Sequence, residues 1–241
     1  MISDILDISK EIIKLEKIQE INKIEINRLS DKVYDTLKER IINLSLKPGQ
    51  KLVEMQLADE LGVSKSPIRD AFHRLEREKL VSMIPYKGWY VETISMEGFK
   101  QICEAREALE IYCLSRSFGS YTETNIQELK GIMESAQKKL AQGNIFAAYQ
   151  SHREFHTAII RKFGNTLVEC MYSNIWDKLN RYLFIIATAW PTRVNIANQE
   201  HFELIKVFEN KDINAAVDTL RIHLSKILED RFTFQKYWES F

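Results

Sequence analysis

The C-terminal part of the chain is a succession of segments in which apolar residues recur every three or four positions, which is the spacing of an amphipathic helix. Breaks rich in Gly, Asn, Pro or Asp separate the segments. The segments lie near 96–118, 122–142, 144–163, 165–190, 192–209 and 211–235. Neither a sustained strand-like alternation nor a repeat of fixed period is present. We therefore expect residues 96–241 to fold as an antiparallel all-helical bundle.

Residues 30–95 change pattern several times within a short span. A helix that Ser30 can cap ends at Pro48 and Gly49. The segment "EMQLADELGVSKSPIRDAFHRLEREKL" then predicts a short helix, a glycine turn and a second helix that Ser64 caps, which together form a helix-turn-helix. Strand-like runs flank "PYKG" and predict a small hairpin. This order of elements indicates a winged helix-turn-helix domain, so the fold class that we expect is mainly α.

Residues 1–29 carry apolar side chains four and three positions apart, beginning at Met1 and Ile5. The spacing predicts a helical arm that packs on a partner subunit, or else a solvated extension. We assign it no chemistry.

Composition limits the class of protein only weakly. Lys plus Arg and Asp plus Glu balance at 34 each, so no overall field favours nucleic acid. The chain has an odd number of cysteines and no CxxC pair, which suits a reducing compartment. The cysteines are Cys103, Cys113 and Cys170. The longest uncharged apolar run, "YLFIIATAW", is far shorter than the ~20 residues of a spanning helix, and no signal peptide begins the chain. We expect a cytoplasmic protein with no membrane partner.

The start of the second helix of the helix-turn-helix carries the residue types that bind DNA. Free amides, serine hydroxyls and cationic side chains gather there, where a helix enters the major groove. A wing tip can approach the minor groove. The DNA contacts that we expect come from Ser64, Lys65, Ser66, Arg69, Arg74, Lys87 and Gly88. Charge alone does not decide between this role and an ordinary solvated helix, because residues 30–95 hold 11 Lys and Arg against 10 Asp and Glu.

A resemblance strengthens the DNA-binding interpretation. The stretch "YDTLKERIINLSLKPGQKLVEMQLADELGVSKSPIRDAFHRLEREKLVSMIPYKGWYV" resembles the DNA-binding domain of the GntR family of bacterial transcription regulators. The resemblance implies sequence-specific binding of a palindromic operator by a homodimer, with contacts from Lys65, Arg69 and the Lys87–Gly88 tip. Met55 stands where some members carry Arg, which puts one contact of those members in doubt.

Four of the five histidines are spaced for a common site. His152 and His156 lie one helical turn apart on one face. If the chain bends near Lys211, His201 lies ten residues before the bend and His223 twelve after it, so the two are level on facing helices. The alternative is that they are satisfied core histidines.

A second resemblance bears on this choice. "REALE" at 106–110, "FHTAII" at 155–160, "EHFELIKVFENKDINAA" at 200–216 and "RIHL" at 221–224 resemble the effector domain of the FCD branch of the same family. Many members of that branch hold a metal through an Asp, a His four residues later and two further His. The corresponding residues here are His152, His156, His201 and His223. The resemblance also places Arg106 in the effector cavity, although Arg106 is equally suited to pair with Glu110 on its own helix.

His152 replaces the usual Asp, and this has a chemical consequence. Four neutral imidazoles leave the charge of a divalent ion uncompensated, so an anion is favoured there. Nitrogen ligands favour zinc, nickel or copper, with zinc the default because of its availability. His152 can also turn away and leave a three-histidine site with open positions.

An enzyme is the rival interpretation, because a metal with open positions suits hydrolysis. Glu154 and Glu203 are the nearest carboxylates, but Glu154 lies two residues from both His152 and His156 and so points to the opposite side of its helix. No HExxH, nucleophile elbow or phosphate loop is present. We therefore expect no enzyme and no catalytic residue. We expect a regulator, in the favoured case a repressor, that a small carboxylate controls through the metal. A purely structural metal, or an enzyme fused to a DNA-binding module, are the alternatives.

Overall fold

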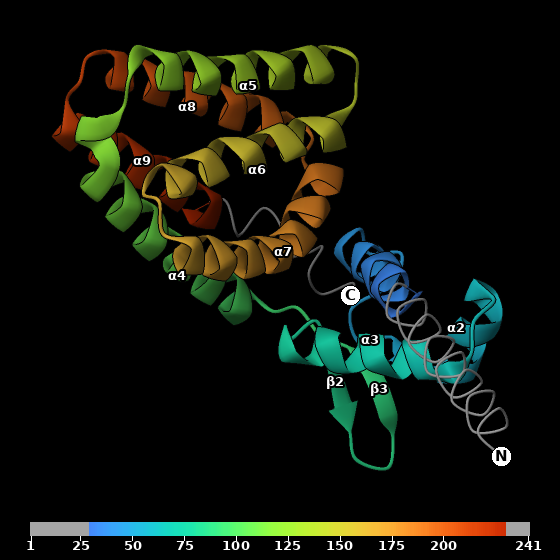
Figure 1. Ribbon diagram of the computed structural model, residues 1–241. Coiled ribbons are helices and arrows are strands. Elements are labelled where there is room, and N and C mark those ends of the chain that lie inside the picture. Colours follow the sequence, from blue (N-terminus) through green and yellow to red (C-terminus); the bar gives the residue numbers. More distant parts are fainter. Residues whose placement is uncertain (1–28, 230–241) are drawn as a thin grey trace, which may run out of the picture. The chain divides into compact units, whose positions relative to one another are not determined.

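The computed structural model describes residues 29–229 (Figure 1). The arm that we predicted at residues 1–29 lies outside them, apart from its last residue. The described residues divide into two compact units. The first contains residues 29–41 and Ser45–Glu92, and the second contains Ile42–Leu44 and residues 93–229.

The N-terminal unit is a winged helix-turn-helix, as the sequence predicted. Its elements are a helix over residues 29–42, β1 (Lys51–Leu52), α2 (Glu54–Leu61), α3 (Lys65–Arg77), β2 (Val81–Ile84) and β3 (Gly88–Val91). The strands form one antiparallel sheet in the order β1-β3-β2, and β2 and β3 make the protruding hairpin in Figure 1. Leu37, Ile68 and Phe72 are fully buried in a core that joins the helices to the sheet. This core fixes α3 relative to the wing.

Two helix caps differ from the prediction. Ser30 lies inside the first helix, where its hydroxyl is 3.4 Å from the Asp70 carboxylate, so it caps nothing. Ser64 does occupy the residue before α3, but its side chain makes no capping hydrogen bond. The Ser64 hydroxyl at the start of α3 is therefore not engaged as a cap.

The second unit is the predicted helical bundle. It consists of α4 (Met96–Ser117), the short 3-10 helix η1 (Phe118–Ser120), α5 (Glu123–Ala141), α6 (Ile145–Lys162), α7 (Thr166–Ala189), α8 (Thr192–Glu209) and α9 (Ile213–Glu229). Side chains of Ser95, Thr122, Asn144 and Asn165 cap the first turns of α4 to α7. These caps explain why the helix boundaries were predictable from the sequence.

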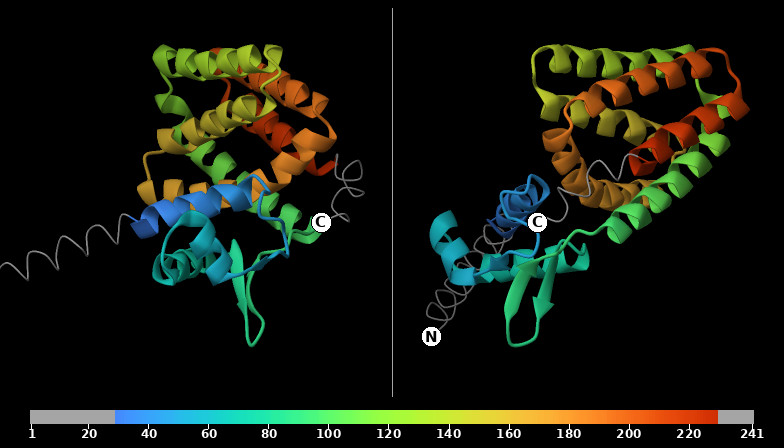
Figure 2. Two further views of the ribbon diagram at one scale, coloured as in Figure 1. Left: turned by 90° about the vertical axis from the view of Figure 1, so that its right-hand side faces the viewer. Right: turned by 180° about the vertical axis from the view of Figure 1, so that it is seen from behind.

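The packing of this unit brings α4, α6, α8 and α9 around one interior region. Helix α5 packs on α6 and α8, while α4 packs on α6, α7 and α9 (Figure 1). Figure 2 shows α9 returning antiparallel beside α8, as the short connection between them requires. Phe155, Leu204 and Leu220 fill the core on the α5 side of this region.

No helix among residues 29–229 is long and apolar enough to cross a lipid bilayer.

Candidate metal centre and nucleic-acid interface

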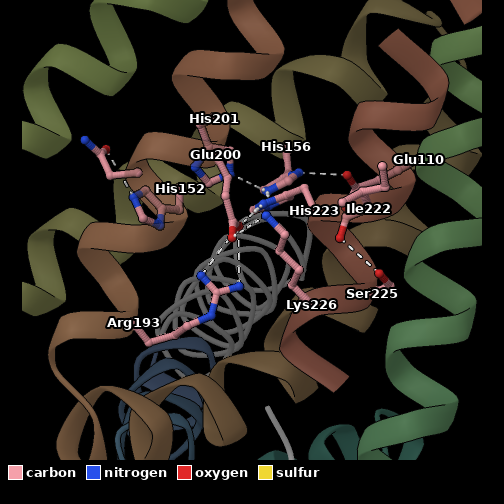
Figure 3. Close-up of polar contacts among 11 residues, drawn as sticks. Glu110, His152, His156, Arg193, Glu200, His201, Ile222, His223, Ser225 and Lys226 are labelled. Carbon is pink, nitrogen blue, oxygen red and sulfur yellow. Dashed lines mark hydrogen bonds and ion pairs between the residues drawn. The ribbon is translucent and has the colours of Figure 1, made fainter. Parts of the chain in front are cut away.

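Three imidazole rings converge in the interior of the helical unit (Figure 3). The Nε2 atom of His156 on α6 lies 2.8 Å from Nε2 of His201 on α8 and 3.2 Å from Nε2 of His223 on α9. Nitrogens bound at ~2.0–2.1 Å to one tetrahedral ion lie about 3.3 Å apart, close to these separations. All three residues are buried. This triad can hold a divalent cation.

The hairpin of α8 and α9 positions two of these rings. Residues 210–212 connect the helices, and Lys211 adopts a positive φ of 55° at the bend. The ring centroids of His201 and His223 are 4.4 Å apart across the hairpin. The prediction that these two histidines are level on facing helices is confirmed.

Glu110 of α4 orients the His156 ring through Nδ1, the nitrogen that does not face the triad. Its carboxylate accepts hydrogen bonds from His156 Nδ1 at 2.7 Å, from Arg106 Nε at 2.6 Å and from the Tyr172 hydroxyl at 2.5 Å. Burial acts to raise the pKa of Glu110, but Arg106 and His156 outweigh it and lower that pKa to about 2. An ionised carboxylate at Nδ1 requires the proton there, which leaves the Nε2 lone pair of His156 for a cation.

Glu200 of α8 does the same for His223. Its Oε2 accepts from His223 Nδ1 at 2.7 Å and lies 3.4 Å from both terminal nitrogens of Arg193, while its Oε1 is 3.3 Å from Lys226 Nζ (Figure 3). Burial acts to raise the pKa of Glu200, but His223 and the two cations lower it to about 2. The centre therefore contains two chains of the same composition, each running from an arginine through a glutamate to a ligand histidine.

The four buried histidines of the helical unit are neutral at physiological pH. Burial lowers the pKa of His152 and of His156 to about 3, and it also lowers the pKa of His201 and of His223. Neutral imidazole is the form that binds metals. The third ring is less well supported than the other two, because Nδ1 of His201 is buried without a hydrogen-bond partner among residues 29–229.

His152 does not join the triad. Its Nε2 lies 3.4 Å from the Asn198 side-chain oxygen, and its ring centroid is 4.7 Å from that of His201. The ring therefore stands beside the converging atoms. The structure differs here from the predicted four-histidine arrangement, because Asn198 on α8 provides His152 with its own partner. This geometry corresponds to the alternative in which His152 turns away and leaves positions on the cation open.

A small cavity of about 30 Å³ adjoins the triad. Its lining consists of Arg106, Tyr149, His152, His156, Trp176, Leu183, Arg193, Ala197, His201, His223 and Ile227. The two sequence-based expectations for Arg106 are compatible in this structure. Its Nε pairs with Glu110, whereas its Nη2 is buried without a partner in the described part of the chain, and its Cζ lies 4.8 Å from the Trp176 ring centroid.

The carboxylates considered for catalysis point away from the centre. Glu154 is exposed on the outer surface of α6, and Glu203 pairs with exposed Lys206. Sequence reasoning excluded Glu154 because of its position on the helix, and the structure agrees.

The N-terminal unit presents the start of α3 to solvent. Ser64, Lys65, Ser66 and Arg69 are exposed there. The Nε atom of Arg69 is 2.7 Å from the Glu54 carboxylate, yet the side chain remains 60% exposed. Along the same face, one turn apart, lie exposed His73 and Arg77, which the sequence analysis did not select. His73 follows Arg69 by four residues and Arg77 follows His73 by four, and this spacing was the available indication.

Arg74 lies elsewhere. Its Nη1 is 2.6 Å from the Asp31 carboxylate, and its Cζ stands 3.9 Å from the centroid of the Tyr34 ring. Both partners belong to the helix over residues 29–42. The guanidinium therefore ties α3 to that helix, in contrast to the DNA contact that we expected.

The wing tip consists of Tyr86, Lys87 and Gly88, of which Tyr86 was not among the predicted contact residues. Gly88 has a φ of 99°, which favours glycine. Tyr86 has a φ of 65° and its side chain is fully exposed. An exposed aromatic residue at a protruding tip is available to a partner molecule.

A winged helix-turn-helix joined to a helical bundle with a buried polar cavity defines a class of DNA-binding transcription regulators. The chain belongs to the GntR family of this class. Residues 29–91 match the profile of the bacterial regulatory proteins, gntR family, and residues 101–226 match that of the FCD domain. These two domains imply DNA binding and a small-molecule effector, as expected from the sequence.

Individual relatives agree. The chain is 26% identical over 173 residues to the Escherichia coli HTH-type transcriptional regulator McbR, covering 70% of this chain and 78% of the relative. It is 21% identical over 210 residues to the Escherichia coli transcriptional repressor RspR, covering 83% and 88%. The fold is that of the solved Escherichia coli McbR/YncC, with a TM-score of 0.72, 22% identity and coverage of 87% and 98%. A GntR regulator from Rhodococcus sp. RHA1 gives the same TM-score at 17% identity, with coverage of 83% and 96%. These relatives are transcription regulators and not enzymes.

Proposed function

We propose that the chain is a homodimeric repressor that binds a palindromic operator in the cytoplasm, and that a small carboxylate bound at the histidine centre releases it. The observation that carries this proposal is the convergence of three imidazole nitrogens beside the Arg106 Nη2 atom, which is buried and has no hydrogen-bond partner among residues 29–229. A cation and an anion-binding group would then share one cavity.

The residues present fit a divalent metal. His156, His201 and His223 offer three neutral nitrogens, and Glu110 and Glu200 hold two of the rings in the ligand tautomer. Three nitrogens favour zinc, nickel or copper, and we name zinc because of its availability. A bound divalent ion would supply open coordination positions to an anion. Arg106 would orient that anion through its Nη2 atom.

The size of the cavity supports a coupling between effector and fold. About 30 Å³ holds one or two water molecules, so even a small carboxylate needs more room than the cavity offers. Side chains lining the cavity on α6, α7, α8 and α9 must move to admit it. Binding therefore favours a second conformer, which is the physical condition for an effector to change operator affinity.

The exposed start of α3 supports the DNA half of the proposal. Lys65 and Arg69 lie one turn apart at a helix start whose free amides attract phosphate, and Ser64 and Ser66 add hydroxyls. Lys87 and Gly88 would approach the minor groove from the wing. Two copies related by a two-fold axis would place their recognition helices in successive major grooves.

Elemental analysis with two matched variants tests the centre. We expect His156→Ala to lose its stoichiometric metal while the helical circular dichroism signal is kept, and His152→Ala, which alters the same cavity but not the triad, to retain it. Metal at full occupancy in His156→Ala would place the site elsewhere.

Operator binding tests the control. Fluorescence anisotropy with labelled operator should report weaker binding when carboxylates are added to the zinc-loaded protein, and no response after chelation. A protein whose carboxylate affinity is independent of the metal, but which loses thermal stability on chelation, would contain a purely structural metal.

A further inference from the structure

The lining of the cavity is chemically one-sided. Its polar side chains are two arginines, four imidazoles and the groups of Tyr149 and Trp176, and among residues 29–229 no carboxylate lines it. Glu110 and Glu200 stand behind the arginines and histidines that they contact. The ligand that suits this lining carries acceptors wherever it meets a polar group.

The charges around the cavity set the charge of that ligand. Buried Arg106 pairs with Glu110, and buried Arg193 with Glu200, so these two pairs contribute no net charge. Imidazoles that bind a metal do so in the neutral form, so the three rings of the triad add no charge. A divalent cation there brings two positive charges, and no carboxylate among residues 29–229 lines the cavity to offset them. Uncompensated charge is costly in a buried site. A ligand with two negative charges cancels it, whereas a monocarboxylate leaves one.

Arg193 provides the second anchor. Both of its contacts with Glu200 are 3.4 Å long, which exceeds the 2.7–3.2 Å typical of a direct hydrogen bond. Glu200 also holds His223 at 2.7 Å and Lys226 at 3.3 Å. Glu200 therefore keeps two partners if Arg193 turns toward a ligand. Arg193 belongs to α8 and Arg106 belongs to α4, so the two guanidinium groups reach the cavity from different helices.

The remaining lining is apolar. Leu183, Ala197 and Ile227 line the cavity between the polar groups. Methylene groups can pack on these side chains, but the oxygens of an inorganic phosphate cannot. The lining therefore suits two acidic groups joined by a short hydrocarbon chain.

We propose that the effector is a short aliphatic dicarboxylate, and that Arg193 selects it by binding the carboxylate that Arg106 and the cation do not engage. This inference rests on the proposed function, since it assumes that the histidine centre binds a cation and an effector.

Isothermal titration calorimetry on the full-length zinc-loaded protein tests the selection. The probes are malonate, succinate and glutarate, together with succinamate and butyrate, which match succinate in length but carry one acid each. We expect the best dicarboxylate to bind at least tenfold more tightly than succinamate and butyrate. Inorganic phosphate serves as the dianion without a hydrocarbon chain, and we expect it to bind more weakly than the best dicarboxylate.

Arg193→Gln and Arg193→Lys test the residue. In Arg193→Gln the preference for succinate over succinamate should fall to about one, while zinc stoichiometry is unchanged. Arg193→Lys keeps the charge and should retain part of the preference. If the role of Arg193 is purely structural, Arg193→Gln should weaken the binding of succinate and of succinamate equally. The ratio of the two affinities would then stay at the wild-type value. If the glutamine variant does not fold, the lysine variant and the wild-type preference still decide.

The outcomes separate the two proposals. Equal affinity for butyrate and succinate, or tighter binding of phosphate than of every dicarboxylate, would overturn the dicarboxylate assignment and leave the proposed function intact. A wild-type preference that Arg193→Gln preserves would overturn the role of Arg193. Zinc-loaded protein that binds none of these anions would overturn both proposals.

Discussion

Replacing Glu110 with Gln tests the centre most directly. The carboxylate is fully buried and accepts three hydrogen bonds, from Arg106, Tyr172 and His156. Glutamine has the same shape but one acceptor oxygen and one NH₂ group. If its oxygen faces Arg106 and Tyr172, the NH₂ group faces His156 Nδ1. That nitrogen must then accept, so the proton moves to Nε2 and the lone pair facing the triad is lost.

Two magnitudes follow from this geometry. Arg106 is left buried without a counter-charge, which costs about 3–5 kcal/mol of folding free energy. Loss of a group that orients a ligand histidine typically costs about 10–100-fold in metal affinity. We expect the upper end or more, because the substitution reverses the tautomer as well as removing a hydrogen bond.

Two assays measure these effects separately. Urea denaturation in the presence of chelator gives the folding free energy of the metal-free protein, and competition with a chromophoric chelator gives the zinc Kd. Tyr172→Phe is the matched control, since it removes one hydrogen bond to the same carboxylate and keeps both the charge and the contact with His156. It should cost about 1.5–3 kcal/mol and change the zinc Kd little. A folded Glu110→Gln protein with wild-type zinc affinity would refute the reasoning.

Three further predictions concern acid stability and DNA binding. The metal-free protein should lose stability as the pH falls from about 6.5 toward 4.5. In this window histidines bind protons in the unfolded chain, whereas in the folded chain burial lowers the pKa of His152 and of His156 to about 3. Acid therefore favours the unfolded chain. Each of these two histidines contributes about 1.4 kcal/mol per pH unit, and a flat melting temperature across this window in calorimetry would contradict the assignment. Arg69→Ala should abolish specific operator binding in a gel shift at a stability cost of at most about 1 kcal/mol, since its ion pair is exposed. Arg74→Ala should instead lower stability more than it weakens operator binding, and the reverse ranking would return Arg74 to the DNA interface.

The local pattern of apolar and polar residues predicted most of the fold. The helical periodicity of the C-terminal part and the polar residues at its breaks gave each helix to within a few residues, except that the last is described only to Glu229. Two caps were misjudged. A serine near a helix start is a good cap by propensity, but Ser30 lies opposite Asp70 in the folded unit and Ser64 makes no capping bond. Tertiary position decided the contact of Ser30, and spacing along the chain does not report it.

The candidate site shows the same division. Helical spacing predicted the side of its helix on which His156 lies. The equal height of two residues on the facing helices of a hairpin predicted that His201 lies close to His223. Glu200 was missed because it precedes His201 by one residue, so the two side chains point about 100° apart, and its partner His223 lies on another helix. His152 shared a predicted face with His156, but the face of a helix does not specify which side chain from a neighbouring helix meets it.

The two arginine–glutamate–histidine chains give the centre a property that the triad alone lacks. Arg106 reaches His156 through Glu110, and Arg193 reaches His223 through Glu200. An anion that attracts the guanidinium groups weakens their hold on the two carboxylates, which then accept more strongly from the Nδ1 protons. A more strongly held Nδ1 proton makes Nε2 a better electron donor. Anion and cation binding should therefore strengthen each other by the same factor, because coupling between two sites is reciprocal. In the proposed function, the effector would thus act on three helices of the bundle, α6, α8 and α9, through the histidines that they carry, and the histidine centre would be where binding becomes a change of conformation.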